Sequence, residues 1–289
     1  MNITGKTRIC GVIGDPIEHS LSPAMHNAAF KEAGLDIVFV AFTVAADKVE
    51  DAAKGMRSLN ILGLNVTMPH KNKIIPYLDK LDPIAKYLMS VNTILNKNGS
   101  LSGYNTDGTG AMQALHQNGV NLKGKKMLLL GGGGAARAIA FAAAKEVDRL
   151  VILNRTPKKS QEFAKALSQK LDKKIEGQAL SSQSIQKQMQ DTQILINATS
   201  VGMNPHEKIS LIPPKLIKPT QTVLDIVYNP LQTKLLEDAK RAGAKTINGV
   251  EMLIHQGAAS FEIWTSQPAP IETMRKAITN QLAPQGAAN

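Results

Sequence analysis

The chain has 289 residues and a mass of 31.1 kDa, with 43% hydrophobic and 20% charged residues. This composition indicates a soluble globular protein with one large or two modest domains, and it excludes a disordered or collagen-like chain. Lys and Arg together number 34 against 23 Asp and Glu, which gives a formal net charge of +11.

The positive charge raises the question of a nucleic-acid or membrane-surface partner. Of the 34 cationic side chains, 27 are Lys and only 7 are Arg, and they are dispersed along the chain with just 11 aromatic residues. Neither an Arg-rich reading surface nor a platform for stacking bases is expected from this pattern. We therefore expect no nucleic-acid partner, and we expect a solvated Lys-rich surface that suits acidic small molecules.

Cysteine content and the N-terminus bear on the compartment. The single cysteine, Cys10, excludes an internal disulfide framework and a zinc site built from cysteines. The first residues lack the basic and then apolar pattern of a signal peptide, so we expect a cytoplasmic protein. Residues 127–144 approach membrane length, but four successive glycines and Arg137 disfavour a lipid-spanning helix, and no membrane or metal partner is expected.

The first hundred residues alternate short apolar runs with helical patterns. Strands are expected at residues 9–13, 37–42 and 61–66, with helices between them near residues 25–33 and 49–56. Residues 92–95 and 101–104 flank an Asn-Lys-Asn-Gly turn and predict a hairpin. The first domain, of about 107 residues, should therefore contain a mixed sheet.

A second series of elements follows a helix predicted at about residues 108–118. Its continuous apolar strands are expected at residues 127–130, 150–153, 194–196 and 223–227. Such strands between helices imply a parallel sheet that is covered on both faces. Two further helices, 250–264 and 271–282, follow without strands, and the pattern alone assigns them to neither domain. Residues 158–190 are polar enough to form a variable surface.

The strand at 127–130 runs directly into a glycine-rich turn and an alanine-rich helix. Gly131 permits the tight turn, and Gly133 and Gly134 let backbone N–H groups approach a pyrophosphate at the helix N-terminus, next to Ala135. We favour dinucleotide binding over a merely structural turn, because the flanking strand, the helix and the next strand are all predicted. Thr199, in the polar segment 197–203 after another strand, should line the nicotinamide side, although that segment could equally be a plain loop.

The end of the second strand of this series indicates which dinucleotide is bound. An NAD site would usually place an acidic residue there, and this chain has Asn154, Arg155 and Thr156 instead. Thr156 is expected to cap the next helix, so Lys158 and Lys159 fall in its first turn, where the helix dipole disfavours cations. This misfit suggests the 2′-phosphate of NADP as a ligand, the alternative being two lysines that extend into water.

Polar residues precede the first predicted helix. Ser22 is an obvious N-cap with Pro23 at the first helical position, and this structural role nearly suffices to explain it. It does not explain Ser20, whose hydroxyl would point into the same space at the helix terminus. The two serines therefore form a candidate carboxylate pocket.

Further polar residues lie at other predicted strand ends. Thr67 and Lys71 follow a strand that breaks at Pro69, which places them where side chains project into a cleft. In isolation Lys71 would be interpreted as a solvated lysine. Asn92 begins a strand, and Asp107 could simply cap the helix that follows it.

Taken together, these segments resemble shikimate dehydrogenase, in the shikimate/quinate dehydrogenase family, over essentially the whole chain. The matching stretches are residues 14–23, 65–71, 91–93, 103–108, the turn at Gly131, 154–156, 225–230 and 249–257. The resemblance implies an α/β enzyme with an N-terminal substrate domain (residues 1–107 plus 249–289) and a Rossmann-like, doubly wound NADP-binding domain (108–248). It implies NADP-dependent interconversion of 3-dehydroshikimate and shikimate, an oxidoreductase reaction of chorismate and aromatic amino-acid biosynthesis.

The resemblance also implies roles for individual residues. It places the substrate carboxylate on Ser20 and Ser22, with Tyr228 nearby, and the substrate hydroxyls on Thr67, Lys71, Asn92, Asp107 and Gln256. It implies cofactor contacts at Gly131, Gly133, Gly134, Ala135, Asn154, Arg155, Thr156, Lys159, Thr199, Val227 and Gly249. Alcohol oxidation needs a group that removes the hydroxyl proton, and we expect a Lys71–Asp107 pair at the reacting hydroxyl, with Lys71 as the proton-transfer group.

Two positions depart from the family pattern. Gly132 stands where the family usually has alanine, and Lys159 stands where arginine is frequent, which gives a point charge in place of a fork. One alternative is a dual quinate/shikimate dehydrogenase that uses NAD or NADP. The others are a catalytically silent ligand sensor and an oxidoreductase for a different cyclic alcohol. A monomer or a homodimer is compatible with the sequence.

Overall fold

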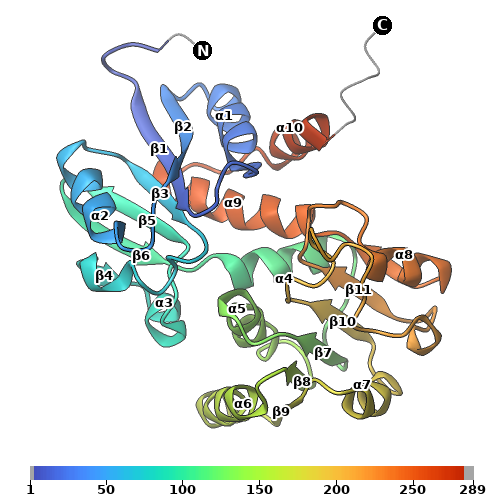
Figure 1. Ribbon diagram of the computed structural model, residues 1–289. Helices are drawn as coiled ribbons and strands as arrows, with labels where there is room; N and C mark the ends of the chain where they lie inside the picture. Colours follow the sequence, from blue (N-terminus) through green and yellow to red (C-terminus); the bar gives the residue numbers. More distant parts are fainter. Residues whose placement is uncertain (1–2, 283–289) are drawn as a thin grey trace, which may run out of the picture. The chain divides into compact units, whose positions relative to one another are not determined.

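The computed structural model describes residues 3–282, and within them the chain divides into two units (Figure 1). The first unit comprises the chain up to Thr106 together with the part from Ile254 onward, and the second unit is Asp107–Leu253. Each unit contains one six-stranded sheet with helices, so the predicted α/β class with two domains is confirmed. None of the helices between residues 3 and 282 is both long and apolar enough to cross a membrane.

Sheet A belongs to the first unit and has the strand order β2-β1-β3-β5-β6-β4. Its elements, in chain order, are β1 (Arg8–Gly14), α1 (Ser22–Glu32), β2 (Ile37–Thr43), α2 (Val49–Ser58), β3 (Gly63–Val66), η1 (Ile75–Tyr77), β4 (Lys80–Leu81), α3 (Pro83–Leu88), β5 (Thr93–Lys97) and β6 (Ser100–Tyr104). Strand β1 is parallel to both of its neighbours, whereas β5 is antiparallel to β3 and β6. The mixed sheet is therefore confirmed.

The predicted hairpin is present in sheet A. Strands β5 and β6 are joined at Asn98 and Gly99, which have φ angles of 54° and 85°. Positive φ at both central residues is the backbone of the tight turn that matches the twist of a hairpin, and Asn-Gly is the sequence that adopts it most readily. The short turn thus fixes the register of the two strands.

An aromatic cluster forms part of the core of the first unit, between α1, β2 and α9 (Gly249–Thr265). The ring of His26 stacks on that of Phe39 with centroids 4.5 Å apart, and the centroid of the Trp264 ring lies 5.2 Å from that of His26. Burial lowers the pKa of His26 to about 3, so the imidazole is neutral and packs as an aromatic ring. Trp264 lies against Gly63, where a Cβ atom would come within 2.2 Å of the indole nitrogen. A side chain at position 63 would therefore displace the indole.

Sheet B belongs to the second unit and has the strand order β12-β11-β10-β7-β8-β9, all parallel. Its elements are α4 (Asp107–Gln117), β7 (Lys126–Leu130), α5 (Gly134–Ala143), β8 (Arg149–Asn154), α6 (Pro157–Leu171), β9 (Ile175–Ala179), α7 (Ser182–Met189), β10 (Ile194–Asn197), η2 (Pro214–Leu216), β11 (Thr222–Asp225), α8 (Lys234–Arg241) and β12 (Lys245–Ile247). Strands β7, β8 and β10 are entirely or almost entirely buried, as their apolar sequences predicted.

The order of sheet B reverses between β7 and β10. Counted from β7, the chain first adds β8 and β9 on one side and then β10, β11 and β12 on the other, which is the doubly wound arrangement of dinucleotide-binding folds. At such a reversal the loops after the two central strands diverge and leave a crevice for a ligand. The glycine turn follows one of these strands, and Thr199 follows the other.

Some elements were missing from the prediction. Residues 158–190 were expected as a polar surface with a helix starting after Thr156; besides that helix, α6, they contain the edge strand β9 and the helix α7, which were not predicted. Strands β9 (IEGQA) and β12 (KTI) lie at the two edges of sheet B and are too short and polar to give an apolar run. The prediction of Ser22 as the N-cap of α1 was wrong, because the helix already begins at Ser22. Its N-cap is Leu21, which has no capping side chain.

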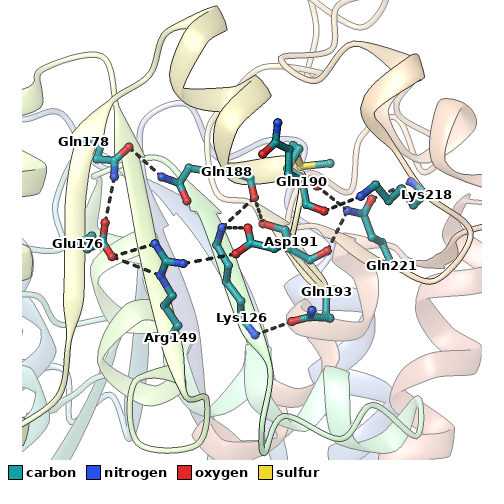
Figure 2. A network of polar contacts seen from close by, with 12 residues as sticks. Lys126, Arg149, Glu176, Gln178, Gln188, Gln190, Asp191, Gln193, Lys218 and Gln221 are labelled. Atoms are coloured by element: carbon teal, nitrogen blue, oxygen red, sulfur yellow. Dashed lines mark hydrogen bonds and ion pairs between the residues drawn. The ribbon is translucent and has the colours of Figure 1, made fainter.

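A polar network lies at the amino ends of the strands of sheet B (Figure 2). Lys126, the first residue of β7, is almost fully buried, and its ammonium group contacts the carboxylate of Asp191 and the carbonyl of Gln188. Arg149, the first residue of β8, pairs with Glu176 (3.1 Å) and with Asp191 (3.4 Å). The hydrogen bond from Lys126 lowers the pKa of Asp191 below its usual range, with a smaller contribution from the charge of Arg149. The predicted cofactor residues lie at the opposite, carboxyl ends of these strands.

We predict that Asp191→Asn lowers the free energy of unfolding by about 1–3 kcal/mol at pH 7, because it leaves the buried Lys126 ammonium without its counter-charge. The pKa of Asp191 is lowered in the folded state, so this stabilisation is present above the usual aspartate range and lost as the pH falls through the folded-state value. Urea unfolding at pH 7 and at acidic pH measures it. The control is Glu237→Gln in the exposed pair with Arg241, expected to change stability by less than about 0.5 kcal/mol. Equal stability of wild type and Asp191→Asn at pH 7 contradicts the prediction.

Candidate functional site

The glycine turn between β7 and α5 requires its glycines for two different reasons. Gly131 has a φ of +119°, and a Cβ atom there would come within 2.6 Å of the carbonyl oxygen of Ala198. Gly133, the N-cap of α5, has an ordinary φ of −76°, and a Cβ atom there would meet nothing within 4 Å. The turn is therefore packed tightly against the loop after β10 on one side and is open at Gly133.

The open side of the turn fits a phosphate group. No side chain caps the N-terminus of α5, so the first N–H groups of the helix, starting with Gly134 and Ala135, have no acceptor within the helix. These groups carry the positive end of the helix dipole, which favours an anion. The residues present thus fit a pyrophosphate that approaches over Gly133.

Asn154, at the end of β8, packs against the same turn. Its Nδ2 donates a hydrogen bond to the carbonyl of Thr156 (3.3 Å), and a Cβ atom on Gly132 would come within 2.6 Å of that nitrogen. The glycine at position 132, which departs from the family pattern, therefore leaves room for the Asn154 amide beside the turn.

Three cations gather at the start of α6. Arg155, Lys158 and Lys159 are exposed, and none of their side chains has a hydrogen-bond or ion-pair partner within residues 3–282. The first turn of α6 contains no acidic residue, and Thr156 is the N-cap, as predicted, but its side chain accepts no capping hydrogen bond. Positive side chains and uncapped N–H groups thus share one helix terminus, which suits an anion such as a phosphate monoester.

The loops after β10 and β11 bring the remaining predicted cofactor residues of the second unit together. Gly249, the first residue of α9, packs on the backbone of the β11 loop, where a Cβ atom would come within 2.4 Å of the Ile226 carbonyl and 2.7 Å of the Val227 carbonyl. Thr199 is held by Asn197, whose Oδ1 accepts hydrogen bonds from the Thr199 hydroxyl (2.7 Å) and N–H (3.2 Å). Burial raises the pKa of Tyr228 above its usual range, so its hydroxyl remains protonated and can donate.

In the first unit, the loop that carries Lys71 is anchored at several points. The Thr67 N–H donates to the Ile13 carbonyl (3.0 Å), and a ring nitrogen of the fully buried His70 lies 2.7 Å from the Val44 carbonyl. The backbone carbonyl of Lys71 accepts a hydrogen bond from Val91 N–H (2.7 Å), directly before Asn92. The structure thus joins Thr67, Lys71 and Asn92 through the backbone, and Lys71 itself is half-buried.

Asn92 and Gln256 belong to one buried network. Asn92 Nδ2 donates to Gln256 Oε1 (3.2 Å) and to the Thr106 hydroxyl (2.9 Å), and that hydroxyl donates to the Gln256 carbonyl (3.0 Å). Asn92 Oδ1 accepts from Thr106 N–H (2.9 Å). Asp107, which is almost fully buried, follows Thr106 directly and begins α4.

Asn65, Thr93 and Ser260 form a second buried network next to these residues, and it was not predicted from the sequence. Asn65 Nδ2 donates to Ser260 Oγ (3.0 Å) and Thr93 Oγ1 (3.3 Å), and the two hydroxyls lie 2.7 Å apart. The signal was an asparagine within the otherwise apolar strand β3, because a buried amide must find partners. Ser20 and Ser22 lie at the start of α1, where Ser22 N–H donates to the Ser20 hydroxyl (3.3 Å).

Comparison with known proteins assigns the family. Residues 12–94 match the family model described as shikimate dehydrogenase substrate binding domain, residues 113–211 match shikimate / quinate 5-dehydrogenase, and residues 249–279 match shikimate 5′-dehydrogenase C-terminal domain. A protein of Methanocaldococcus jannaschii named shikimate dehydrogenase (NADP(+)) is 43% identical over 281 residues, which are 97% of this chain and 99% of that protein. The chain belongs to the shikimate dehydrogenase family.

Solved structures of the family have the same fold. A crystal structure of a shikimate dehydrogenase in complex with NADP+ is 42% identical, with a TM-score of 0.91 over 97% of this chain and 98% of the other. Shikimate 5-dehydrogenase from Listeria monocytogenes, in complex with shikimate and NAD, is 41% identical, with a TM-score of 0.89 over 96% of this chain and 98% of the other. The family resemblance stated from the sequence is therefore confirmed.

The two glycines of the turn should respond oppositely to substitution. We predict that Gly131→Ala lowers the free energy of unfolding by about 2–4 kcal/mol, because the positive φ strains alanine and its Cβ meets the Ala198 carbonyl. Gly133→Ala is the matched control and should change stability by less than about 1 kcal/mol, since its Cβ enters open space. Chemical denaturation without added ligand measures both. Equal stabilities of the two variants contradict this account of the turn.

Proposed function

We propose that the chain is an NADP-dependent shikimate dehydrogenase that catalyses the reversible reduction of 3-dehydroshikimate to shikimate, a step toward chorismate and the aromatic amino acids. The observation that carries the proposal is the match over nearly the full chain to relatives named shikimate dehydrogenase (NADP(+)), 43% identical. The polar residues at the strand ends of both sheets support it.

We assign the second unit to the cofactor. Gly131, Gly133, Gly134 and Ala135 would hold the pyrophosphate, because the turn is open and its helix uncapped. Asn154, Arg155, Thr156 and Lys159 would hold the 2′-phosphate of NADP, which is supported by the absence of an acidic residue and by the unpartnered cations at the start of α6. Thr199, Val227 and Gly249 would contact the nicotinamide end.

We assign the first unit, with Asp107 and Tyr228, to the substrate. Ser20 and Ser22 would bind the carboxylate at the start of α1 together with the Tyr228 hydroxyl, and Thr67, Asn92 and Gln256 would bind the ring hydroxyls. The network that joins Asn92 to Gln256 supports this assignment, because it fixes both amides before a ligand arrives.

Lys71 and Asp107 would act at the reacting hydroxyl. When bound, NADP+ accepts a hydride from the carbinol carbon. Lys71 would take the hydroxyl proton in the oxidation and return it to the carbonyl oxygen in the reduction, while Asp107 orients the same oxygen and the ammonium group.

The main alternative is a dual quinate/shikimate dehydrogenase that uses NAD as well as NADP. Arg155 and the lysines after it favour NADP, because an ionised 2′-phosphate would neutralise charges that have no other partner. We place the enzyme in the cytoplasm, where the buried free thiol of Cys10 would remain reduced. Its assembly as a monomer or homodimer stays a prediction.

One assay tests both substrate and cofactor. Purified protein with shikimate or quinate, each with NADP+ or NAD+, is followed by nicotinamide absorbance, and the pair shikimate and NADP+ should give the highest kcat/KM. Arg155→Asp should lower kcat/KM for NADP+ by at least about tenfold and leave NAD+ use nearly unchanged, because it replaces attraction to the 2′-phosphate by repulsion. Lys187→Asp, the same charge change on the exposed side of α7, is the control. Faster turnover of quinate with NAD+, or equal losses for both cofactors in Arg155→Asp, contradicts the proposal.

A further inference from the structure

Asp225, at the end of β11, is a buried carboxyl group without a cation. Its side chain is fully inaccessible, and it forms no ion pair with any residue from 3 to 282. Two other buried charges of the second unit have such partners: Lys126 pairs with Asp191, and Asp238 pairs with Lys234 and Arg241. Burial raises the pKa of Asp225 to about 6, and its hydrogen bonds oppose that rise, so the group remains ionised at neutral pH.

Three donors compensate the charge of Asp225. Asn197 Nδ2 (2.9 Å) and Val227 N–H (3.1 Å) donate to Oδ1, and the Thr233 hydroxyl (2.7 Å) donates to Oδ2. A carboxylate is the side chain that can accept all three at this position, because an amide of the same shape has only one accepting oxygen.

Each donor fixes a different segment of the chain. Asn197 also holds Thr199 through its Oδ1 and donates to the Val201 carbonyl (3.0 Å), so it shapes the loop after β10. Val227 lies in the loop after β11, and Thr233 caps the helix α8 that ends this loop. One carboxylate therefore connects the loops that follow two neighbouring strands, β10 and β11.

We propose that Asp225 is a positioning residue that holds the loops after β10 and β11 in the conformation that seats the nicotinamide ring. The inference rests on the proposed function, since it takes Thr199 and Val227 as contacts of the nicotinamide end. The adenosine and phosphate contacts, at residues 131–135 and 154–159, come from other strand ends and form no hydrogen bond with the Asp225 side chain.

This separation within the cofactor site gives the test. In Asp225→Asn, kcat for shikimate oxidation should fall by at least about tenfold, because a displaced nicotinamide ring is no longer positioned to accept the hydride from the substrate. The fluorescence change of NADPH on binding, which reports the surroundings of the reduced nicotinamide, should diminish. The Kd of 2′-phospho-ADP-ribose, the cofactor without its nicotinamide, should stay within about twofold when measured by calorimetry.

Two further variants keep the test informative if Asp225→Asn folds poorly. Thr233→Val removes one of the three donors and should lower kcat in the same way, whereas Thr233→Ser keeps the hydroxyl and should restore it. Asp238→Asn, another buried aspartate of the second unit, is the matched control and should leave kcat and the NADPH signal unchanged.

The outcomes separate this inference from the proposed function. Unchanged kcat in both Asp225→Asn and Thr233→Val, or a loss of 2′-phospho-ADP-ribose affinity that parallels the loss of kcat, overturns the positioning role. A wild-type protein that binds neither NADPH nor 2′-phospho-ADP-ribose overturns the proposed function, and the positioning role with it.

Discussion

The structure depends on one constraint: polar side chains buried in or next to the ends of strands must satisfy their hydrogen bonds inside the protein. In the first unit, Asn92 meets it through Thr106 and Gln256, next to the network of Asn65, Thr93 and Ser260. In the second unit, Asp225 meets it through Asn197, Val227 and Thr233. Each network ties several loops to one side chain, so the strand-end loops are held in defined positions without a ligand.

The two ends of the strands of sheet B differ in how their polar groups are paired. In sheet B, the strand beginnings are connected by charges that pair with each other, as Lys126 does with Asp191 (Figure 2). The carboxyl ends of the strands instead carry groups without partners in the protein: the backbone N–H groups at the uncapped N-terminus of α5, and the cations before and within the first turn of α6. Unsatisfied donors and unpaired positive charge at one edge are what an anionic cofactor requires.

Much of this was predictable from the sequence, for identifiable reasons. The strands β7, β8 and β10 were predicted because they are continuous apolar runs. The hairpin was predicted because Asn98-Gly99 is a typical hairpin-turn sequence, and the glycine turn was predicted because it lies between a predicted strand and a predicted helix. The edge strands β9 and β12 were missed because they bury little apolar surface. The networks of Asn65 and Asp225 were missed because their partners come from distant segments, such as Ser260, 195 residues from Asn65. The N-cap of α1 was predicted one residue too late. A Ser-Pro pair can occupy the N-cap and first helical position or the first two helical positions, and the sequence does not distinguish them.

We propose Lys71 as the proton-transfer group in the oxidation of shikimate, and steady-state kinetics of Lys71→Ala test this role most directly. We expect kcat to fall by about 10²-fold or more, with KM for shikimate changed only a few-fold, because proton transfer in the transition state is lost and most substrate contacts remain. Lys73→Ala, an exposed lysine two residues away, serves as the control and should behave as wild type. A variant whose kcat falls only a few-fold while KM rises strongly would contradict the claim and make Lys71 a binding residue.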